Sequence, residues 1–195
     1  ANFTALLADE TAEQISITNQ NLTVNDGEIS VTNANLLNDT TSGTVTATID
    51  AGTRVDDLKT LEGSNAYTIT IANADATGST ATEFNTINSA TTVAIDATAV
   101  TGLASDDIAD IKTLLNDATD DTKFEDGSFG NLATVVVADT TLSGSDLADA
   151  IDDVTSLTGG TDTVFTITAA TTITGSEANF TALLADETAE QISIT

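Results

Sequence analysis

Acidic side chains are the residues of this chain whose type and spacing could do chemistry. Asp120, Asp121, Glu125 and Asp126 gather within the run DATDDTKFEDGSFGN at 117–131. Carboxylate oxygens are the ligands that a hard cation such as calcium prefers. The run matches neither the EF-hand loop nor the calcium-binding nonapeptide, so a solvated acidic loop is the alternative interpretation. These four carboxylates are therefore the candidate calcium site of the chain.

The residue types that most enzymes need are missing. The chain has no histidine and no cysteine, which removes the commonest general base, thiolate nucleophiles and most transition-metal sites. Paired carboxylates can hydrolyse glycosides, but aromatic residues make up only 4% of this chain and offer no platform for a sugar. We predict that the protein is not an enzyme and that it holds no cofactor other than calcium.

The charge balance decides which partners the surface attracts. Four basic residues stand against 31 acidic ones, which gives a formal net charge of −27. Such a surface repels nucleic acid and anionic membranes, and it suits cations and salt water. No apolar run approaches the roughly 20 residues that span a bilayer, so direct membrane insertion is not expected either.

Runs of alternating apolar residues predict the strands that must position these side chains. Period two with β-branched residues is typical of a β-strand. Six such runs occur in the first 177 residues, and Gln191–Thr195 begins the first run again. The apolar positions are Ile15 and Ile17; Val45, Ala47 and Ile49; Tyr67, Ile69 and Ile71; Val93, Ile95 and Ala97; Val135 and Val137; Phe165 and Ile167.

Between the strands, the apolar spacing changes to that of short amphipathic helices. Thr80–Glu83 and Thr53–Asp56 have the spacing of a capping box or its aspartate variant. Gly63 and Gly159 are expected to end two of the helices. The predicted helical segments are 55–61, 84–87, 108–115, 147–154 and 180–184.

One unit is therefore a strand, a turn, a short helix and a return, and it is too small to bury its own apolar faces. Stacking such units gives a continuous core, which predicts an α/β solenoid-like repeat with parallel strands and short helices or turns. The 177 residues make about six irregular units of roughly 30 residues each. The acidic insertion at 117–131 is expected to project as a loop. The alternative is a discrete β-rich or α/β domain repeated in tandem.

The end of the chain repeats its beginning letter for letter. Ala1–Thr18 and Ala178–Thr195 both read ANFTALLADETAEQISIT, 177 positions apart. We interpret 1–177 as one full tandem repeat and 178–195 as the start of the next. The chain also lacks methionine, which fits an excerpt of a longer array. We expect a structural repeat of an extracellular filament, stalk or surface-layer protein, whose partners are its own neighbouring copies.

Threonines mark the strand faces that point away from the predicted core. Thr46 and Thr48 alternate along one strand, and Thr68 and Thr70 along the next. Such Thr-x-Thr steps resemble ice-binding solenoids, although threonine also suits any solvated strand face. Asp96 interrupts the pattern. An adhesin, or a solenoid module that binds glycan or ice, is therefore the alternative function.

Residues 163–184 read TVFTITAATTITGSEANFTALL, and 133–151 echo them. This phrase resembles tandem repeats in very large secreted surface proteins of marine cyanobacteria and related bacteria. The resemblance implies an extracellular or cell-surface polymer that is adapted to salt and is structural or adhesive. It transfers no functional residue to this chain.

Overall fold

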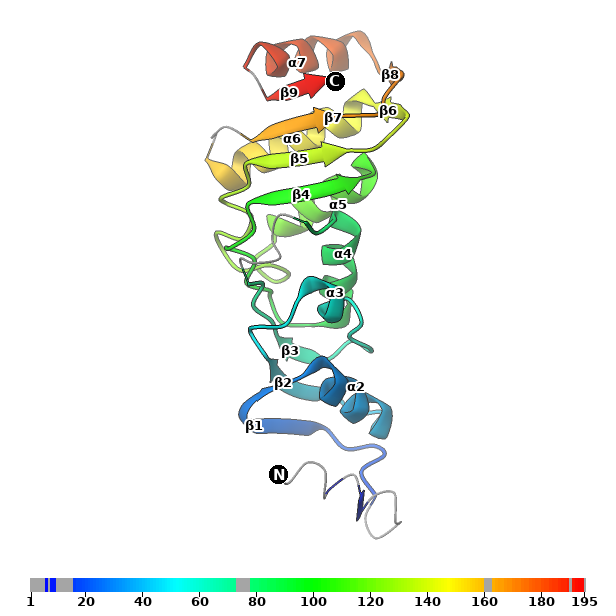
Figure 1. Cartoon of the computed structure of the whole chain (residues 1–195), viewed down its shortest axis with the longest axis vertical. Helices are drawn as coiled ribbons and strands as arrows, with labels where there is room; N and C mark the ends of the chain where they lie inside the picture. The colour runs from blue at the N-terminus through cyan, green and yellow to red at the C-terminus, as the bar shows by residue number, and fades with distance from the viewer. Residues whose placement is uncertain are drawn as a thin grey trace.

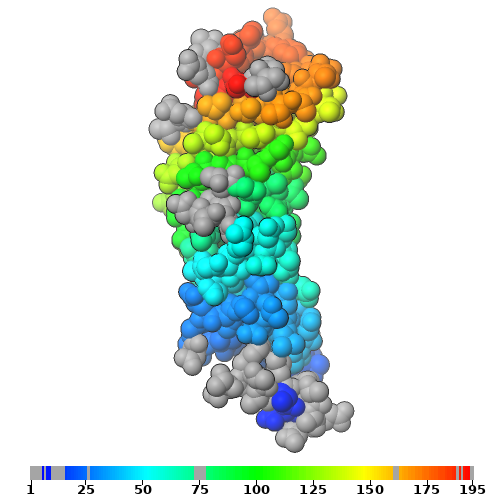
Figure 2. Space-filling view, in the orientation of Figure 1, coloured from blue at the N-terminus to red at the C-terminus, as the bar shows by residue number. Residues whose placement is uncertain are grey.

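Parallel strands follow one another along an elongated molecule, and helices line one side of them (Figure 1). The computed structural model describes residues 6, 8–9, 16–72, 78–159, 163–189 and 191–194. In the space-filling view the chain runs from one end of the body to the other in successive bands (Figure 2). The α/β class with parallel strands and short helices, which the sequence predicts, is confirmed.

Strands and helices alternate for most of the chain. The strands are β1 (Leu22–Ile29), β2 (Val45–Ile49), β3 (Ala66–Thr68), β4 (Gly102–Asp106), β5 (Thr134–Val137), β6 (Thr141–Ser143), β7 (Val164–Ile167), β8 (Thr172–Thr174) and β9 (Ile192–Ile194). The helices are α2 (Val31–Thr40), α3 (Val55–Leu58), α4 (Ala81–Ala90), α5 (Ile108–Ala118), α6 (Gly144–Thr158) and α7 (Glu177–Thr188).

The strands form three parallel sheets, in the orders β1-β2-β3, β4-β5-β7-β9 and β6-β8. Paired strands are close in the chain: Thr46 pairs with Ala66, and Gly102 pairs with Thr134. Single parallel bridges continue the pairing between the first two sheets, at Asn65 with Thr91, Thr70 with Asp96 and Ile95 with Phe124.

Alternating strand residues build the core, as the period-two runs predict. Along β2 the residues are buried and exposed in strict turn, with Val45, Ala47 and Ile49 pointing inward. After β3 the same alternation continues to Ile71, which is 1% exposed. Removing such aliphatic side chains from water stabilises a fold by about 1.5–3 kcal/mol each. One buried cluster runs through the described residues from Val31 to Leu183.

Helix ends show where the cap predictions hold and where one fails. The capping box at Thr80 and Glu83 is confirmed at the start of α4, and Gly159, with φ of 70°, ends α6 in the left-handed conformation. The box predicted at Thr53–Asp56 is wrong. The N-cap of α3 is Arg54, which has no hydroxyl to accept from the first turn, and the helix ends after Leu58.

Several elements differ from those the sequence predicts. Helix α2 is not predicted, because asparagine and threonine occupy much of it and only Val31, Ala34 and Leu37 are buried. The strand expected at 93–97 makes only single bridges. Most of the predicted strand at 15–17 is described as irregular backbone, and Ile15 lies outside the described residues.

The segment 117–131 does not project as the sequence suggests. Phe124 and Phe129 are both fully buried. The Phe129 ring packs edge-on against Phe84 at 5.5 Å and Phe124 at 5.2 Å between ring centres. The buried Ser128 hydroxyl donates to Ile95 O and accepts from Ala97 N–H. These contacts fold the segment against its neighbouring strands and helices, while Asp120, Asp121, Glu125 and Asp126 face the solvent.

Candidate functional site

The predicted calcium ligands lie in the turns that follow α5. Asp120, Asp121, Glu125 and Asp126 are all exposed. The Asp120 Oδ1 atom accepts from the Thr122 hydroxyl at 2.7 Å and from the Thr122 backbone N–H at 2.9 Å. These bonds favour the charged carboxylate and hold the pKa of Asp120 below its ordinary value. Asp120 is therefore already engaged in its own turn.

The structure does not gather these carboxylates into a cation cage. Among all described residues, which include the whole of 117–131, no three acidic side chains converge in a way that could hold a metal ion. Nearby, Lys123 Nζ lies 2.5 Å from Asp117 Oδ1, so part of the local charge is balanced within the chain. Calcium binding here stays a prediction from the sequence.

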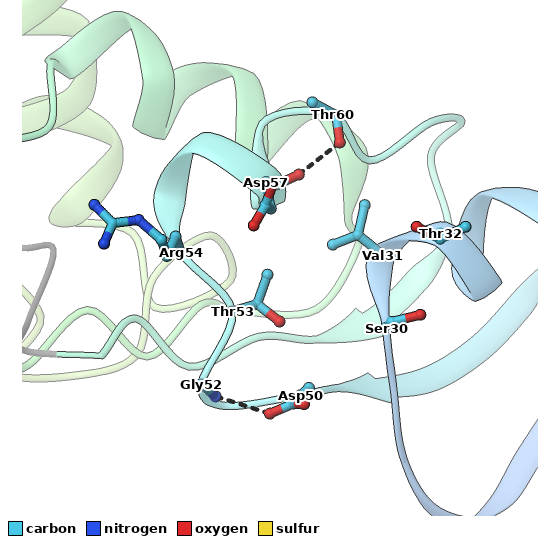
Figure 3. A pocket seen from close by; sticks show the side chains of 9 residues that line it. All are labelled: Ser30, Val31, Thr32, Asp50, Gly52, Thr53, Arg54, Asp57 and Thr60. Atoms are coloured by element: carbon cyan, nitrogen blue, oxygen red, sulfur yellow. Dashed lines mark hydrogen bonds between the residues drawn. The ribbon is translucent and has the colours of Figure 1, made fainter.

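A polar groove lies beside the first residues of α2 and α3 (Figure 3). Its volume is about 380 Å³. No motif in the sequence indicates this groove, because one wall is the unpredicted helix α2. The groove is lined by Ser30, Val31, Thr32, Asp50, Gly52, Thr53, Arg54, Asp57 and Thr60.

The polar groups of this groove are used for local structure. The Ser30 hydroxyl accepts from Asn33 N–H as the N-cap of α2. Asp50 Oδ1 accepts from Gly52 N–H at 2.9 Å, and the Arg54 guanidinium points away from it (Figure 3). With no histidine in the chain, Ser30 has no imidazole to activate it. The Ser30 hydroxyl and the Asp50 carboxylate of this groove therefore already take part in local hydrogen bonds.

The predicted threonine face is exposed but staggered. Thr46, Thr48, Thr68 and Thr70 are all exposed. The register sets Thr48 beside Thr68, whereas Thr46 lies beside Ala66, and Thr70 bridges to Asp96. Because the strands are offset by two residues, the threonines form a short two-strand step and not the flat array that the sequence suggests.

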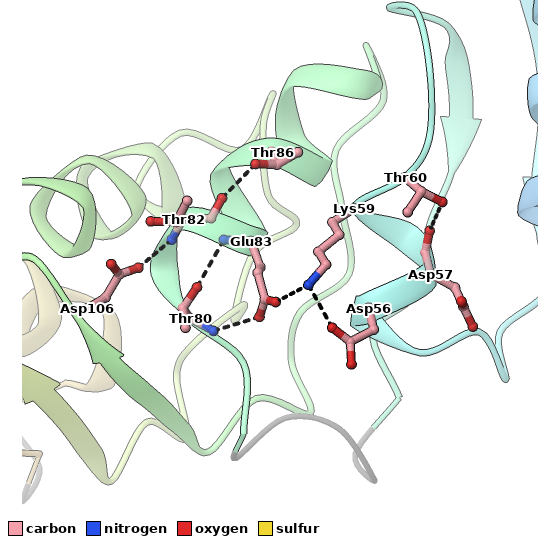
Figure 4. Close-up of polar contacts among 9 residues, drawn as sticks. All are labelled: Asp56, Asp57, Lys59, Thr60, Thr80, Thr82, Glu83, Thr86 and Asp106. Atoms are coloured by element: carbon pink, nitrogen blue, oxygen red, sulfur yellow. Dashed lines mark hydrogen bonds and ion pairs between the residues drawn. The ribbon is translucent and has the colours of Figure 1, made fainter.

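Polar contacts between successive helices are the most extensive feature of the helical side. Lys59, just after α3, places Nζ 2.7 Å from Asp56 and 2.5 Å from Glu83 of α4 (Figure 4). At the start of α4, Thr82 N–H donates to Asp106 of β4 at 2.7 Å. The hydrogen bond from Lys59 holds the pKa of Asp56 below its ordinary value.

Lysine joins the next pair of helices in the same way. Lys112 of α5 lies 2.8 Å from Asp146 and 2.7 Å from Asp149, both on α6. The hydrogen bond from Lys112 lowers the pKa of Asp146 and raises that of Lys112. Lys59, Lys112 and Lys123 therefore neutralise carboxylates, and Lys59 and Lys112 tie neighbouring helices together.

Buried polar side chains join successive strands beneath the helices. Asn65, only 4% exposed, accepts from Val45 N–H at 2.8 Å and donates to Asn38 Oδ1 and to the Tyr67 hydroxyl. A buried threonine after several helices donates to a carbonyl 21–31 positions earlier. These bonds run from Thr41 to Gln20 O, from Thr91 to Tyr67 O and from Thr163 to Leu132 O.

Comparison with known proteins assigns no family to this arrangement. No protein-family model matches the chain, and no curated protein or solved structure matches it either. Among the described residues, no helix is long and apolar enough to cross a membrane. The contacts that the geometry offers are those between successive strands and helices of the described residues.

Proposed function

We propose that this chain is a structural repeat of an extracellular filament, stalk or surface layer, built as an α/β solenoid whose units continue from copy to copy. One observation carries the proposal: the main contacts between elements join strands and helices that are near each other in the chain. Strands pair in parallel with the next strand or the next but one along the chain, and from α3 onward each helix packs on the following helix. A body of this kind has no natural end, because each added unit repeats the same contacts.

The repeated 18-residue segment supports a tandem array. Its second copy contains most of α7 and all of β9, so a covalent continuation would lead out of the sheet-forming segment Ile192–Ile194. Most of the first copy lies outside the described residues. Because 1–177 would be the period, the proposed partner is the next copy of the same chain.

Length measurements on a two-copy chain test this proposal. The chain of residues 1–177 followed by residues 1–195 is compared with residues 1–195 alone by small-angle X-ray scattering. We expect the maximum dimension to nearly double while the cross-section stays constant. A two-copy chain that folds back into a compact body would contradict the filament. Electron microscopy of the native assembly should show a regular axial repeat.

The exposed threonines support one alternative, an adhesive module that binds glycan or ice. Thr48 and Thr68 are neighbours on the solvent side of the first sheet. Thermal-hysteresis and glycan-array measurements test this alternative. The matched control is Thr48→Lys, which keeps the strand but spoils the threonine step. Activity that this variant loses would favour the adhesin, whereas inactivity of both proteins would favour a purely structural repeat.

A further inference from the structure

An apolar trough lies at the end of the molecule formed by α7 and β9. Its volume is about 160 Å³, and its apolar lining includes Phe180, Leu183, Leu184 and Ile192. Phe180 is 40% exposed and Leu184 is 66% exposed. Besides these two, the large apolar side chain exposed among the described residues is Leu36, on α2 at the other end of the molecule.

The residue of α4, α5 and α6 at the position of Leu184 in α7 shows which surroundings this position has in the other helices. The eighth residue after each N-cap faces the following unit. In α4 this residue is Asn88, which donates to Asp117 of α5. In α5 and α6 it is Leu115 and Ile151, which are 0% and 2% exposed, and each of these helices packs on the helix that follows. In α7 it is Leu184.

The fourth residue after the N-cap, on the inner face of each helix, is also apolar. This residue is Phe84 in α4, Ile111 in α5 and Leu147 in α6, and none of them is more than 1% exposed. In α7 the equivalent residue is Phe180. Leucine and phenylalanine at these two positions of α7 fit a helix that is meant to be covered.

The chain itself contains the segment that follows such an end. Ile192–Ile194 repeats Ile15–Ile17, and after Thr18 the chain continues into β1 and α2. β9 pairs with the preceding strand β7. The backbone that follows Ile17 instead bonds forward.

Three hydrogen bonds show this forward pairing. Ser42 N–H donates to Thr18 O at 2.7 Å, and Leu22 N–H donates to Thr44 O at 2.9 Å. The Thr41 hydroxyl donates to Gln20 O. The repeated segment therefore has a backward edge, visible at β9, and its continuation has a forward edge, visible at residues 18–22.

Helix α2 carries an apolar side chain at the position that reaches backward. In α6 the sixth residue after the N-cap is Asp149, which pairs with Lys112 of the preceding helix. The sixth residue of α2 is Leu36, which is 44% exposed. The exposed leucine at the backward position of α2 matches the exposed Leu184 at the forward position of α7, with Phe180 one turn before it.

We propose that residues 19–40 of a following copy of this chain cover α7 and β9, with Leu36 of that copy against Phe180 and Leu184. This inference rests on the proposed tandem array and adds how the copies meet. The 18-residue segment is then a shared unit, bonded backward to β7 of its own copy and forward to the strands of the next. The exposed apolar face becomes an ordinary interior contact of the stack.

Thiol labelling tests this contact at single positions, because the chain has no cysteine. Residues 1–195 are compared with an extended chain in which residues 19–72 follow Thr195. Leu184→Cys should react rapidly in 1–195 and at least tenfold more slowly in the extended chain. Equal rates in the two chains would overturn the inference. They would leave the array itself open to the scattering test above, so the two failures are distinguishable.

Matched variants guard this test against folding artefacts. Ala185→Cys, at a position exposed in α7, should react rapidly in both chains, and Ile151→Cys, at a buried position, slowly in both. Leu36→Asp in the appended copy should restore rapid labelling of Leu184→Cys, whereas the same change in the first copy should leave it slow. Slow labelling that survives Leu36→Asp in the appended copy would show that another segment covers α7, and it would overturn the assignment to α2.

Discussion

The half of the molecule from α2 to α4 and the half from α5 to α7 differ in the uncharged side chains that join successive elements. In the first half, side-chain amides join the elements. Asn35 donates to Thr60 O and accepts from Glu62 N–H, and Asn65 accepts from Val45 N–H and donates to the Tyr67 hydroxyl. In the second half, the eighth residues after the N-caps of α5 and α6 are the buried Leu115 and Ile151, and Lys112 also joins these two helices through Asp146 and Asp149.

The comparison shows that the place where successive elements meet is kept more strongly than the type of residue that makes the contact. Hydrogen bonds are directional, so the amides fix the short steps around the four-residue helix α3. Apolar contacts are not directional, and they accompany the longer helices α5 and α6. The use of amide hydrogen bonds in one half and apolar packing in the other also explains why the two halves share so little sequence.

The largest effect should come from placing the chemistry of one half into the other. Ile151→Asn places an amide in apolar surroundings, without a hydrogen-bond partner, and removes an aliphatic side chain from the core. We expect the free energy of unfolding to fall by about 4 kcal/mol, which lowers Tm by roughly 10 °C. Calorimetry measures this. Ile151→Val is the matched control and should cost about 1 kcal/mol. A tolerated asparagine would contradict the apolar character of this contact.

The reverse change in the polar half should be nearly as costly. Asn65→Leu keeps a similar volume but leaves Val45 N–H and Asn38 Oδ1 without their present partner. Such buried unsatisfied groups cost about 1–3 kcal/mol each, so we expect a loss of about 3 kcal/mol in urea unfolding. The exposed Asn116→Leu should change stability by less than about 0.5 kcal/mol. Equal stability of Asn65→Leu and the parent chain would show that amides are dispensable here.

A smaller, pH-dependent effect should distinguish the α6–α7 contact. Burial, and then repulsion from Asp152, raises the pKa of Asp186 above its ordinary value. A raised folded-state pKa means that stability is present below the ordinary pKa and is lost as pH rises through the folded value. Asp186→Asn should therefore raise Tm by about 1–2 °C at pH 7 and leave it unchanged near pH 3.

The exposed Asp39→Asn is the control for that experiment, because it removes the same charge without relieving burial. It reports only the effect of net charge. If Asp39→Asn and Asp186→Asn raise Tm equally at pH 7, the burial of Asp186 has no separate effect. Melting curves between pH 3 and pH 7 decide the point.

The smallest difference should lie between two salts. Salt screens the net charge of −27, and the Debye length is about 8 Å at 0.15 M, so Tm should rise with sodium chloride. Since no three acidic side chains of the described residues converge, calcium chloride at equal ionic strength should give the same Tm. A higher Tm in calcium that Asp120→Asn abolishes would instead establish the predicted site at 117–131.

The strands with strict alternation could be predicted from the sequence. β2, β5, β7 and β9 fall on predicted runs, because burial of one strand face leaves a period of two. β1 and β4 could not be predicted, since Asn25, Asp26 and Gly27 interrupt the pattern in β1 and a register shift divides each strand. Strand pairing there depends on the neighbouring unit and not on the local sequence.

The candidate site could likewise be predicted only in part. The acidic residues of 117–131 could be found by composition, but their separation could not, because Phe124 and Phe129 pull the segment into the core. An acidic run with two phenylalanines could have signalled this burial. The groove beside α2 could not be foreseen, since the apolar stripe of that helix is limited to Val31, Ala34 and Leu37 among asparagines and threonines.

The stacking of parallel strands along the long axis has a mechanical consequence. A pull along this axis runs across the strands, so it loads their hydrogen bonds one row at a time and peels the body from an end. Since paired strands such as β2 and β3 or β4 and β5 are joined by 20 to 32 residues, each row would release about 70–110 Å of chain. We expect force–extension curves to show a sawtooth of low, regular force peaks, so that the body would absorb a pull gradually. A single large rupture would exclude this row-by-row release.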